Sequence, residues 1–88
     1  MREEQTNDPE AAALQALGWT LSDDQRADRF LALTGLTPDQ LRGRIGEPGL
    51  LAALIRFLEA HEPDLVACAT FIGISPLQLI DVRRRLES

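Results

Sequence analysis

Two seven-residue segments, "GLTPDQL" at residues 35–41 and "GISPLQL" at residues 73–79, share one pattern of residue types. Each begins with a glycine, which can adopt the positive φ that ends a helix. Each then places a hydroxyl residue before a proline, with a glutamine three residues after the hydroxyl, as in a reciprocal capping box at a helix start. The pattern therefore predicts two helix-turn-helix corners, and it favours an all-α fold over any fold that contains a sheet.

The same kind of signal marks the helices that precede the first corner. Asp8 can cap a helix that has Pro9 in its first turn, and Gly18 is predicted to end that helix in a left-handed conformation. Ser22 is predicted to cap a second helix, which runs to Gly35. We therefore expect two helices before the first corner.

The second half of the chain contains similar signals for the starts and ends of helices. A helix is predicted from Pro48 to His61, and the nearly uniform apolar segment at residues 63–73 is predicted to form a short buried helix. No stretch alternates apolar and polar residues for long enough to indicate a strand. The expected fold is an all-α, compact bundle of about five or six short helices with two helix-turn-helix-like corners. Residues 1–8 are expected to form a polar, disordered tail, and residues 9–88 a single helical domain.

Apolar residues at helical spacing identify the expected core. Burial of each large apolar side chain contributes about 1.5–3 kcal/mol, so a set of this size can stabilise a small domain. The predicted core comprises Trp19, Phe30, Leu31, Leu50, Leu54, Phe57, Leu58, His61, Leu65, Cys68, Phe71 and Ile72.

Few side chains are placed for catalysis or for metal binding. Cys68 is the only cysteine, which excludes an internal disulfide and a cysteine-based zinc site, and its apolar neighbours indicate a buried thiol. His61 is the only histidine, and neither Glu59 nor Glu62 lies three or four residues from it, where a helix would bring a carboxylate beside the ring. It is instead expected in the last turn of its helix, where a cation complements the helix dipole. The sequence therefore predicts a protein that is not an enzyme, with no catalytic residues, no cofactor and no metal.

Composition also bears on where the protein is located. No apolar run approaches the ~20 residues of a transmembrane helix. The segment "MREEQTNDPE" at residues 1–10 is acidic and polar, unlike the basic start and apolar centre of a signal peptide. A cytosolic location and no membrane association are expected.

The distribution of charge bears on nucleic-acid binding. Residues 1–28 contain seven acidic residues and two arginines, a net charge of −5, whereas residues 29–88 contain seven of each and sum to zero. Contacts to phosphate dominate the affinity of proteins for DNA, and this chain offers little surplus positive charge for them. Nucleic-acid binding is therefore disfavoured. A helix-turn-helix regulator that inserts helix 76–86 into the major groove is the alternative function.

The helix predicted at residues 76–86 carries more apolar residues than one buried face requires. Leu77 and Ile80 are the surplus, and Arg84 follows them at helical spacing. These three residues are the candidate interaction surface, for an unknown protein partner or for a second copy of the chain in a homo-oligomer. The predicted function is that of a small protein-protein interaction or adaptor module.

Two segments, "DRFLALTGLTPDQLR" and "FLEAHEPDLVACATFIGISP", resemble a family of small bacterial, chiefly alphaproteobacterial, proteins known as domain-of-unknown-function family 3572. The resemblance covers about residues 10–86, and its most specific parts are the "RFLALTGL" run and the Glu-Pro entry to the short apolar helix. It implies a small, helical, cytosolic protein without an assigned activity. It provides no functional residues to carry over to this chain.

Overall fold

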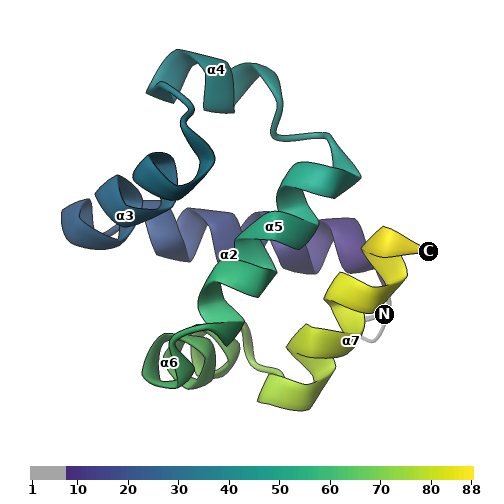
Figure 1. Ribbon diagram of the computed structural model, residues 1–88. Helices are drawn as coiled ribbons and strands as arrows, with labels where there is room; N and C mark the ends of the chain where they lie inside the picture. The colour runs from purple at the N-terminus through teal and green to yellow at the C-terminus, as the bar shows by residue number, and fades with distance from the viewer. Residues whose placement is uncertain (1–7) are drawn as a thin grey trace.

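The computed structural model describes residues 8–88, in which six helices and no strand are found. The predicted all-α bundle is confirmed (Figure 1). The expected disordered tail at residues 1–8 lies outside the described residues, except for Asp8. The helices are α2 (Pro9–Leu21), α3 (Asp24–Thr34), α4 (Pro38–Gly43), α5 (Pro48–Glu59), α6 (Glu62–Ile72) and α7 (Pro76–Glu87).

Both predicted corners are present, and each turns on a glycine with positive φ. Gly35 ends α3 with φ of 75°, and its N–H donates to the carbonyl of Leu31 at 2.8 Å. Gly73 ends α6 with φ of 93°, and its N–H donates to the carbonyl of Ala69 at 2.9 Å. Because residues with a side chain rarely adopt this conformation, glycine is what lets each helix end where it does.

The helices that leave these corners begin with the predicted capping boxes. At α4, Thr37 Oγ1 accepts from the N–H of Gln40 at 3.1 Å, and Gln40 Oε1 accepts from the N–H of Thr37 at 2.9 Å. Ser75 and Gln78 form the same pair of bonds at the start of α7, at 3.1 and 2.8 Å. These bonds satisfy N–H groups that a helix start leaves without intrahelical partners. The second corner sets α6 and α7 at 92° to each other.

Two predicted helix boundaries before the first corner are wrong. Gly18 does not end α2, which continues to Leu21; the extra turn buries Thr20, whose hydroxyl donates to the carbonyl of Ala16 at 2.9 Å. Ser22 is the C-cap of α2, and Asp23 caps α3 by accepting from the N–H of Arg26 at 3.0 Å. Ser22, Asp23 and Asp24 are all suitable N-cap residues, so the local sequence does not determine which of them begins the helix.

The different roles of two glycines give a testable contrast. Gly73→Ala is expected to lower the free energy of unfolding by about 1–2 kcal/mol, because alanine is strained at positive φ. Gly18→Ala is expected to raise it by about 0.5–1 kcal/mol, because alanine is the better residue within an exposed helical turn. A Cβ at either position meets no atom within 4 Å. Urea denaturation followed by circular dichroism measures both changes, and equal signs for the two variants would contradict this assignment.

Helix α5 lies at the centre of the bundle and packs against α2, α6 and α7, while α2 also contacts α3, α6 and α7 (Figure 1). Most of the predicted core residues on α5 are buried. The small buried alanines of α2 allow α2 to lie close to α5. The core cluster consists of Ala12, Ala13, Ala16, Leu17, Phe30, Leu41, Leu50, Leu51, Leu54, Ile55, Leu58, Leu65, Cys68, Ala69, Leu79 and Val82.

Two residues that were predicted in the core are exposed. Phe71 leaves 68% of its surface in solvent, because the buried face of α6 is formed by Leu65, Cys68 and Ala69, and α6 is therefore not covered all round. His61 is also exposed: α5 ends at Glu59, and the histidine is the N-cap residue of α6 rather than part of the last turn of α5.

Helix α3 is joined to α2 by a contact between two side chains. The guanidinium of Arg26 lies 3.7 Å from the ring centroid of Trp19 and donates to the Trp19 carbonyl at 2.7 Å. Trp19 was predicted in the core; its side chain packs against the core but is only half-buried. A cation-π contact with a hydrogen bond at the same pair fixes the α2–α3 turn.

Candidate functional site

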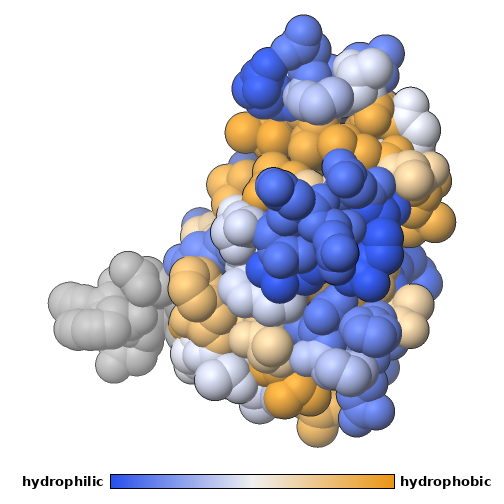
Figure 2. All heavy atoms as spheres, turned by 90° about the vertical axis from the view of Figure 1, so that its left-hand side faces the viewer, coloured by the Kyte–Doolittle hydropathy of each residue, from blue (hydrophilic) through white to orange (hydrophobic). Residues whose placement is uncertain are grey.

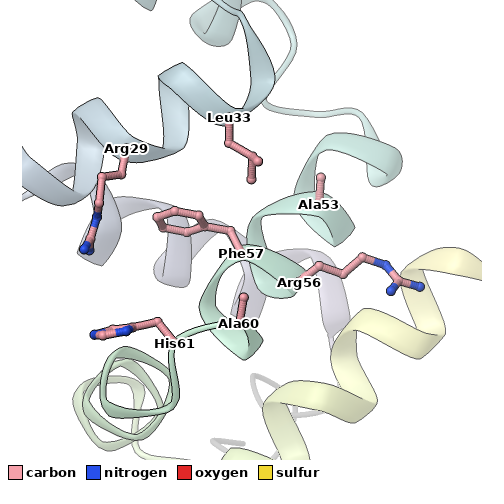
Figure 3. A pocket seen from close by; sticks show the side chains of 7 residues that line it. All are labelled: Arg29, Leu33, Ala53, Arg56, Phe57, Ala60 and His61. Atoms are coloured by element: carbon pink, nitrogen blue, oxygen red, sulfur yellow. The ribbon is translucent and has the colours of Figure 1, made fainter.

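A hollow of about 500 Å³ lies between α3 and α5. Figure 3 shows Leu33 of α3 pointing toward Phe57 of α5, with Arg29 and His61 on one side and Arg56 directed away toward α7. Most of the surface inside the hollow is apolar. The residues that line it are Arg29, Leu33, Ala53, Arg56, Phe57, Ala60 and His61.

A second hollow of about 380 Å³ adjoins the first, with Leu33 and Ala53 lining both. Its other lining residues are Thr34, Leu36, Arg44, Glu47, Gly49 and Leu50. We call the two together the α3–α5 groove. In Figure 2, which faces the α3 side, a band of hydrophobic surface runs between the hydrophilic centre of the view and the hydrophilic surface at its top, where α4 lies.

The groove exists because α3 touches α5 at one end of its length and stands away from it at the other. Phe30 of α3 is fully buried, and its ring packs against Phe57 with centroids 5.4 Å apart and planes at 59°. One turn further along α3, Leu33 has no such neighbour and leaves 66% of its surface in solvent. The aromatic pair thus forms the closed end, and Leu33 overhangs the open part.

Ion pairs hold the cationic side chains at the rim of the groove. Arg29 NH2 lies 3.1 Å from Asp64 Oδ2, which joins α3 to α6. Arg56 Nε donates to Glu87 Oε2 at 2.7 Å, which joins α5 to α7. Arg44, the third arginine of the lining, pairs with Glu47 at 2.9 Å, so each arginine that lines the groove is already bound to a carboxylate.

His61 has an acidic neighbour that the sequence reasoning overlooked. Its Nε2 lies 3.9 Å from Asp64 Oδ2, because Asp64 follows it by three residues in the first turn of α6. The same carboxylate oxygen also accepts from Arg29, and the hollow beside the imidazole is apolar. The lining residues of the groove include no serine or cysteine that His61 and Asp64 could activate as a nucleophile.

Other classes of site find little support in the part of the chain that the structure describes. Residues 8–88 contain no cluster of three or more histidine, cysteine, aspartate or glutamate side chains able to hold a metal ion. None of the helices described is by itself long and apolar enough to cross a bilayer. Cys68 is fully buried, as predicted, and burial raises the pKa of its thiol to about 12.

The structure separates the three residues of the predicted interaction surface. Leu77 is 76% exposed at the start of α7, and Arg84 is also exposed. Ile80 is half-buried and packs against the core. The exposed apolar part of that surface on α7 is therefore Leu77.

The other arginines of α7 are bound to carboxylates. Arg83, which is only 14% exposed, donates to both carboxylate oxygens of Glu59 and to Glu87, at 2.7 to 3.2 Å. Arg85 pairs with Asp81 at 3.0 Å, one turn earlier on the same helix. The positive charge of this helix is thus largely matched within the protein.

Acid should weaken the α5–α7 connection. The guanidinium of Arg56, and then that of Arg83, holds the pKa of the Glu87 carboxyl below its ordinary value of 4.5. Because the folded-state pKa is the lower one, this contribution to stability is present above about pH 4.5 and is lost as the pH falls through the folded-state value. Glu87→Gln should therefore lower the melting temperature at neutral pH and not at pH values well below the folded-state pKa. An equal difference in melting temperature between Glu87→Gln and wild type at both pH values would contradict this role of Glu87.

A comparison with known protein families establishes the family of this chain. The model of the family described as "Protein of unknown function (DUF3572)" matches residues 6–88. The chain belongs to this family. The resemblance predicted from "RFLALTGL" and the Glu-Pro helix entry is thereby confirmed, and the family model extends over both corners and all six described helices. No curated protein and no solved structure matches the chain.

Leu33 was the functional candidate that sequence reasoning missed. The core residues predicted within α3 were Phe30 and Leu31, and Leu33 lies beside them as a surplus apolar residue. The argument that singled out Leu77 on α7 applies equally to this position. What the sequence could not show is that α5 lies opposite Leu33 with space between them.

Proposed function

We propose that this member of the family is a non-enzymatic, cytosolic protein-interaction module, and that the α3–α5 groove is the surface that receives its partner. The observation that carries the proposal is the apolar groove itself, with Leu33 overhanging it and Phe57 forming its floor. A large aliphatic side chain left in solvent beside an apolar hollow is a usual feature of sites that bind another protein.

This assignment places the interaction on a different surface from the α7 residues singled out in the sequence. Leu77 is as exposed as Leu33, but the adjacent Ile80 packs against the core instead of extending the exposed surface. At Leu33, by contrast, a hollow with several apolar lining residues adjoins the exposed side chain. Hollow apolar surfaces gain more from a partner side chain than a single protruding residue does.

A matched pair of variants tests the choice of surface. Leu33→Glu and Leu77→Glu make the same chemical change at two residues of similar exposure, 66% and 76%. Each tagged protein is expressed in its source cells, and co-purifying proteins are quantified by mass spectrometry against wild type. We expect one or a few proteins to be retained by wild type and Leu77→Glu and lost from Leu33→Glu, while circular dichroism shows all three proteins folded.

The other outcomes each have a definite meaning. Loss of the same proteins only from Leu77→Glu would move the interaction to α7 and overturn the groove assignment. Equal retention by all three proteins would exclude both surfaces. Recovery of no specific protein with wild type would overturn the interaction function.

One observation favours the alternative function of a helix-turn-helix regulator. The 92° angle between α6 and α7 falls in the range found in such motifs. The internal pairing of Arg83 and Arg85 opposes it, because phosphate contacts need available cations. We therefore expect no shift of random duplex DNA at low salt. A clear shift that fades steeply as salt is added would favour the regulator.

A further inference from the structure

The first hollow of the α3–α5 groove has the size of a small-molecule site. Its volume is about 500 Å³, within the range of about 300–1,000 Å³ that is usual for such sites. An apolar cavity of about 150 Å³ holds one benzene ring. The hollow therefore has room for a molecule of two fused rings, although part of its volume is open to solvent.

Planar side chains gather on one side of this hollow. Figure 3 shows the Phe57 ring, the Arg29 guanidinium and the His61 imidazole there, with Leu33 above the ring. The guanidinium carbon lies 5.9 Å from the Phe57 ring centroid, and the ring is only half-buried although it also packs on Phe30. Phenyl rings attract other rings beyond the gain from buried area, and guanidinium groups stack on rings as well. These groups therefore favour an aromatic molecule over an aliphatic one of the same size.

The ion pairs of the lining favour a molecule without charge. The guanidinium groups of Arg29 and Arg56 are bound to Asp64 and Glu87, and Arg56 is directed away from the hollow. An anion would have to compete with those carboxylates, and a cation would meet no carboxylate among the residues that line the first hollow. Most of the lining surface is apolar, so either ion would lose its hydration without gaining a partner.

The walls of the hollow are in place before any molecule binds. The Phe30–Phe57 contact, with centroids 5.4 Å apart, and the Arg29–Asp64 ion pair hold α3 at two points. A preformed site binds more tightly than a flexible one, because less conformational freedom is lost on binding.

We propose that the first hollow binds an uncharged aromatic molecule of about two fused rings, held between Leu33 and Phe57. This site goes beyond the proposed interaction function, because its occupancy can be measured on the purified protein without any partner. The molecule and the proposed partner both use the surface beside Leu33, so they should compete. The competition rests on the proposed function, and the small-molecule site does not.

Titration with 2-naphthol tests the site, because this probe has two fused aromatic rings and is uncharged at neutral pH. Binding is followed in amide NMR spectra of the full chain. We expect a dissociation constant on the order of 0.1–1 mM, as for other ligands of this size. The largest changes in chemical shift should centre on Leu33, Ala53 and Phe57.

Three analogues of the probe separate the chemical classes. 2-Naphthoate is an anion, 2-naphthylmethylamine is a cation, and decahydro-2-naphthol is an uncharged aliphatic molecule of similar size. We expect each ion to bind at least about tenfold more weakly than 2-naphthol, and the aliphatic alcohol about three- to tenfold more weakly. Equal or tighter binding of any analogue would overturn the assigned class of ligand.

A variant that fills the hollow tests its location. Ala53 lines both hollows from α5, so a tryptophan at this position should occupy the space and abolish binding of 2-naphthol by folded Ala53→Trp. The matched control is Ala67→Trp, since Ala67 is an exposed alanine of α6 that does not line the groove. It should bind 2-naphthol as wild type does. If Ala53→Trp does not fold, the shift changes in wild type decide the location.

Two results would overturn the small-molecule site. One is the absence of binding by wild type at millimolar 2-naphthol, and the other is a set of shift changes centred outside the first hollow. Neither result affects the interaction function, which is judged by co-purification with Leu33→Glu and Leu77→Glu.

The competition is tested by adding saturating 2-naphthol to the co-purification experiment with wild type. We expect loss of the same proteins that Leu33→Glu is expected to lose. Unchanged retention would reject the competition, because it would show that the partner does not enter the first hollow.

Discussion

Phe30→Ala is expected to lower the free energy of unfolding by about 3–5 kcal/mol, the usual cost of emptying a buried phenylalanine site. The side chain is fully buried and packs on Phe57, so its removal leaves a cavity between α3 and α5. A domain of 88 residues has a total stability of only about 4–13 kcal/mol, so this single change removes a large share of it.

The matched control for this prediction is Phe71→Ala. Phe71 was expected in the core from the sequence, but it is 68% exposed, so its truncation should change stability by less than about 0.5 kcal/mol. Urea denaturation of the two variants and wild type measures both effects. Similar losses from both variants would show that α6 buries Phe71 against some surface in solution, and would contradict this packing.

Phe30 also matters for function, because it sets the position of α3 relative to α5. Helix α3 packs mainly on α2, and the Phe30–Phe57 pair is its aromatic contact with α5. If Phe30→Ala remains folded at low temperature, we expect it to lose the co-purifying proteins that Leu33→Glu is expected to lose. Retained binding by a folded variant would show that α3 is held in place by other contacts.

Cys68 is expected to react with thiol reagents at least about a thousandfold more slowly than an unprotected cysteine near pH 8. Burial raises the pKa of its thiol from 9.0 to about 12, which lowers the fraction of reactive thiolate by about three powers of ten. The side chain has no exposed surface, which slows reaction further because the reagent cannot reach the sulfur. Labelling in the native protein should therefore occur only from opened molecules.

This slow labelling provides a measure of opening that is independent of spectroscopy. The rate with an aromatic disulfide reagent should rise in Phe30→Ala by the factor that corresponds to its loss of stability, and should be unchanged in Phe71→Ala. Unfolding in urea should restore the rate of an exposed cysteine. Fast labelling of the native wild type would contradict the burial of Cys68 between α6 and the rest of the core.

The candidate site could be predicted from the sequence only in part. Leu77 was identified because it is an apolar residue beyond those needed for one buried helix face. Leu33 fits the same description and was missed, although both leucines are exposed. Their difference lies in their surroundings: Leu33 faces a hollow whose floor is formed by Phe57, a residue that is 24 positions later in the chain. Likewise, the partners of the rim arginines, Asp64 and Glu87, are distant in sequence from Arg29 and Arg56.

The sequence by itself determined the helical fold, the two corners and their capping boxes. Those features depend on bonds between residues within about four positions of one another, such as Thr37 with Gln40 or Gly73 with Ala69, so local chemistry is sufficient to specify them. Only the tertiary structure decided that Phe71 and His61 are exposed and that a groove opens beside Leu33. Burial depends on which helix packs against a given face, and that is settled by contacts between segments far apart in the chain.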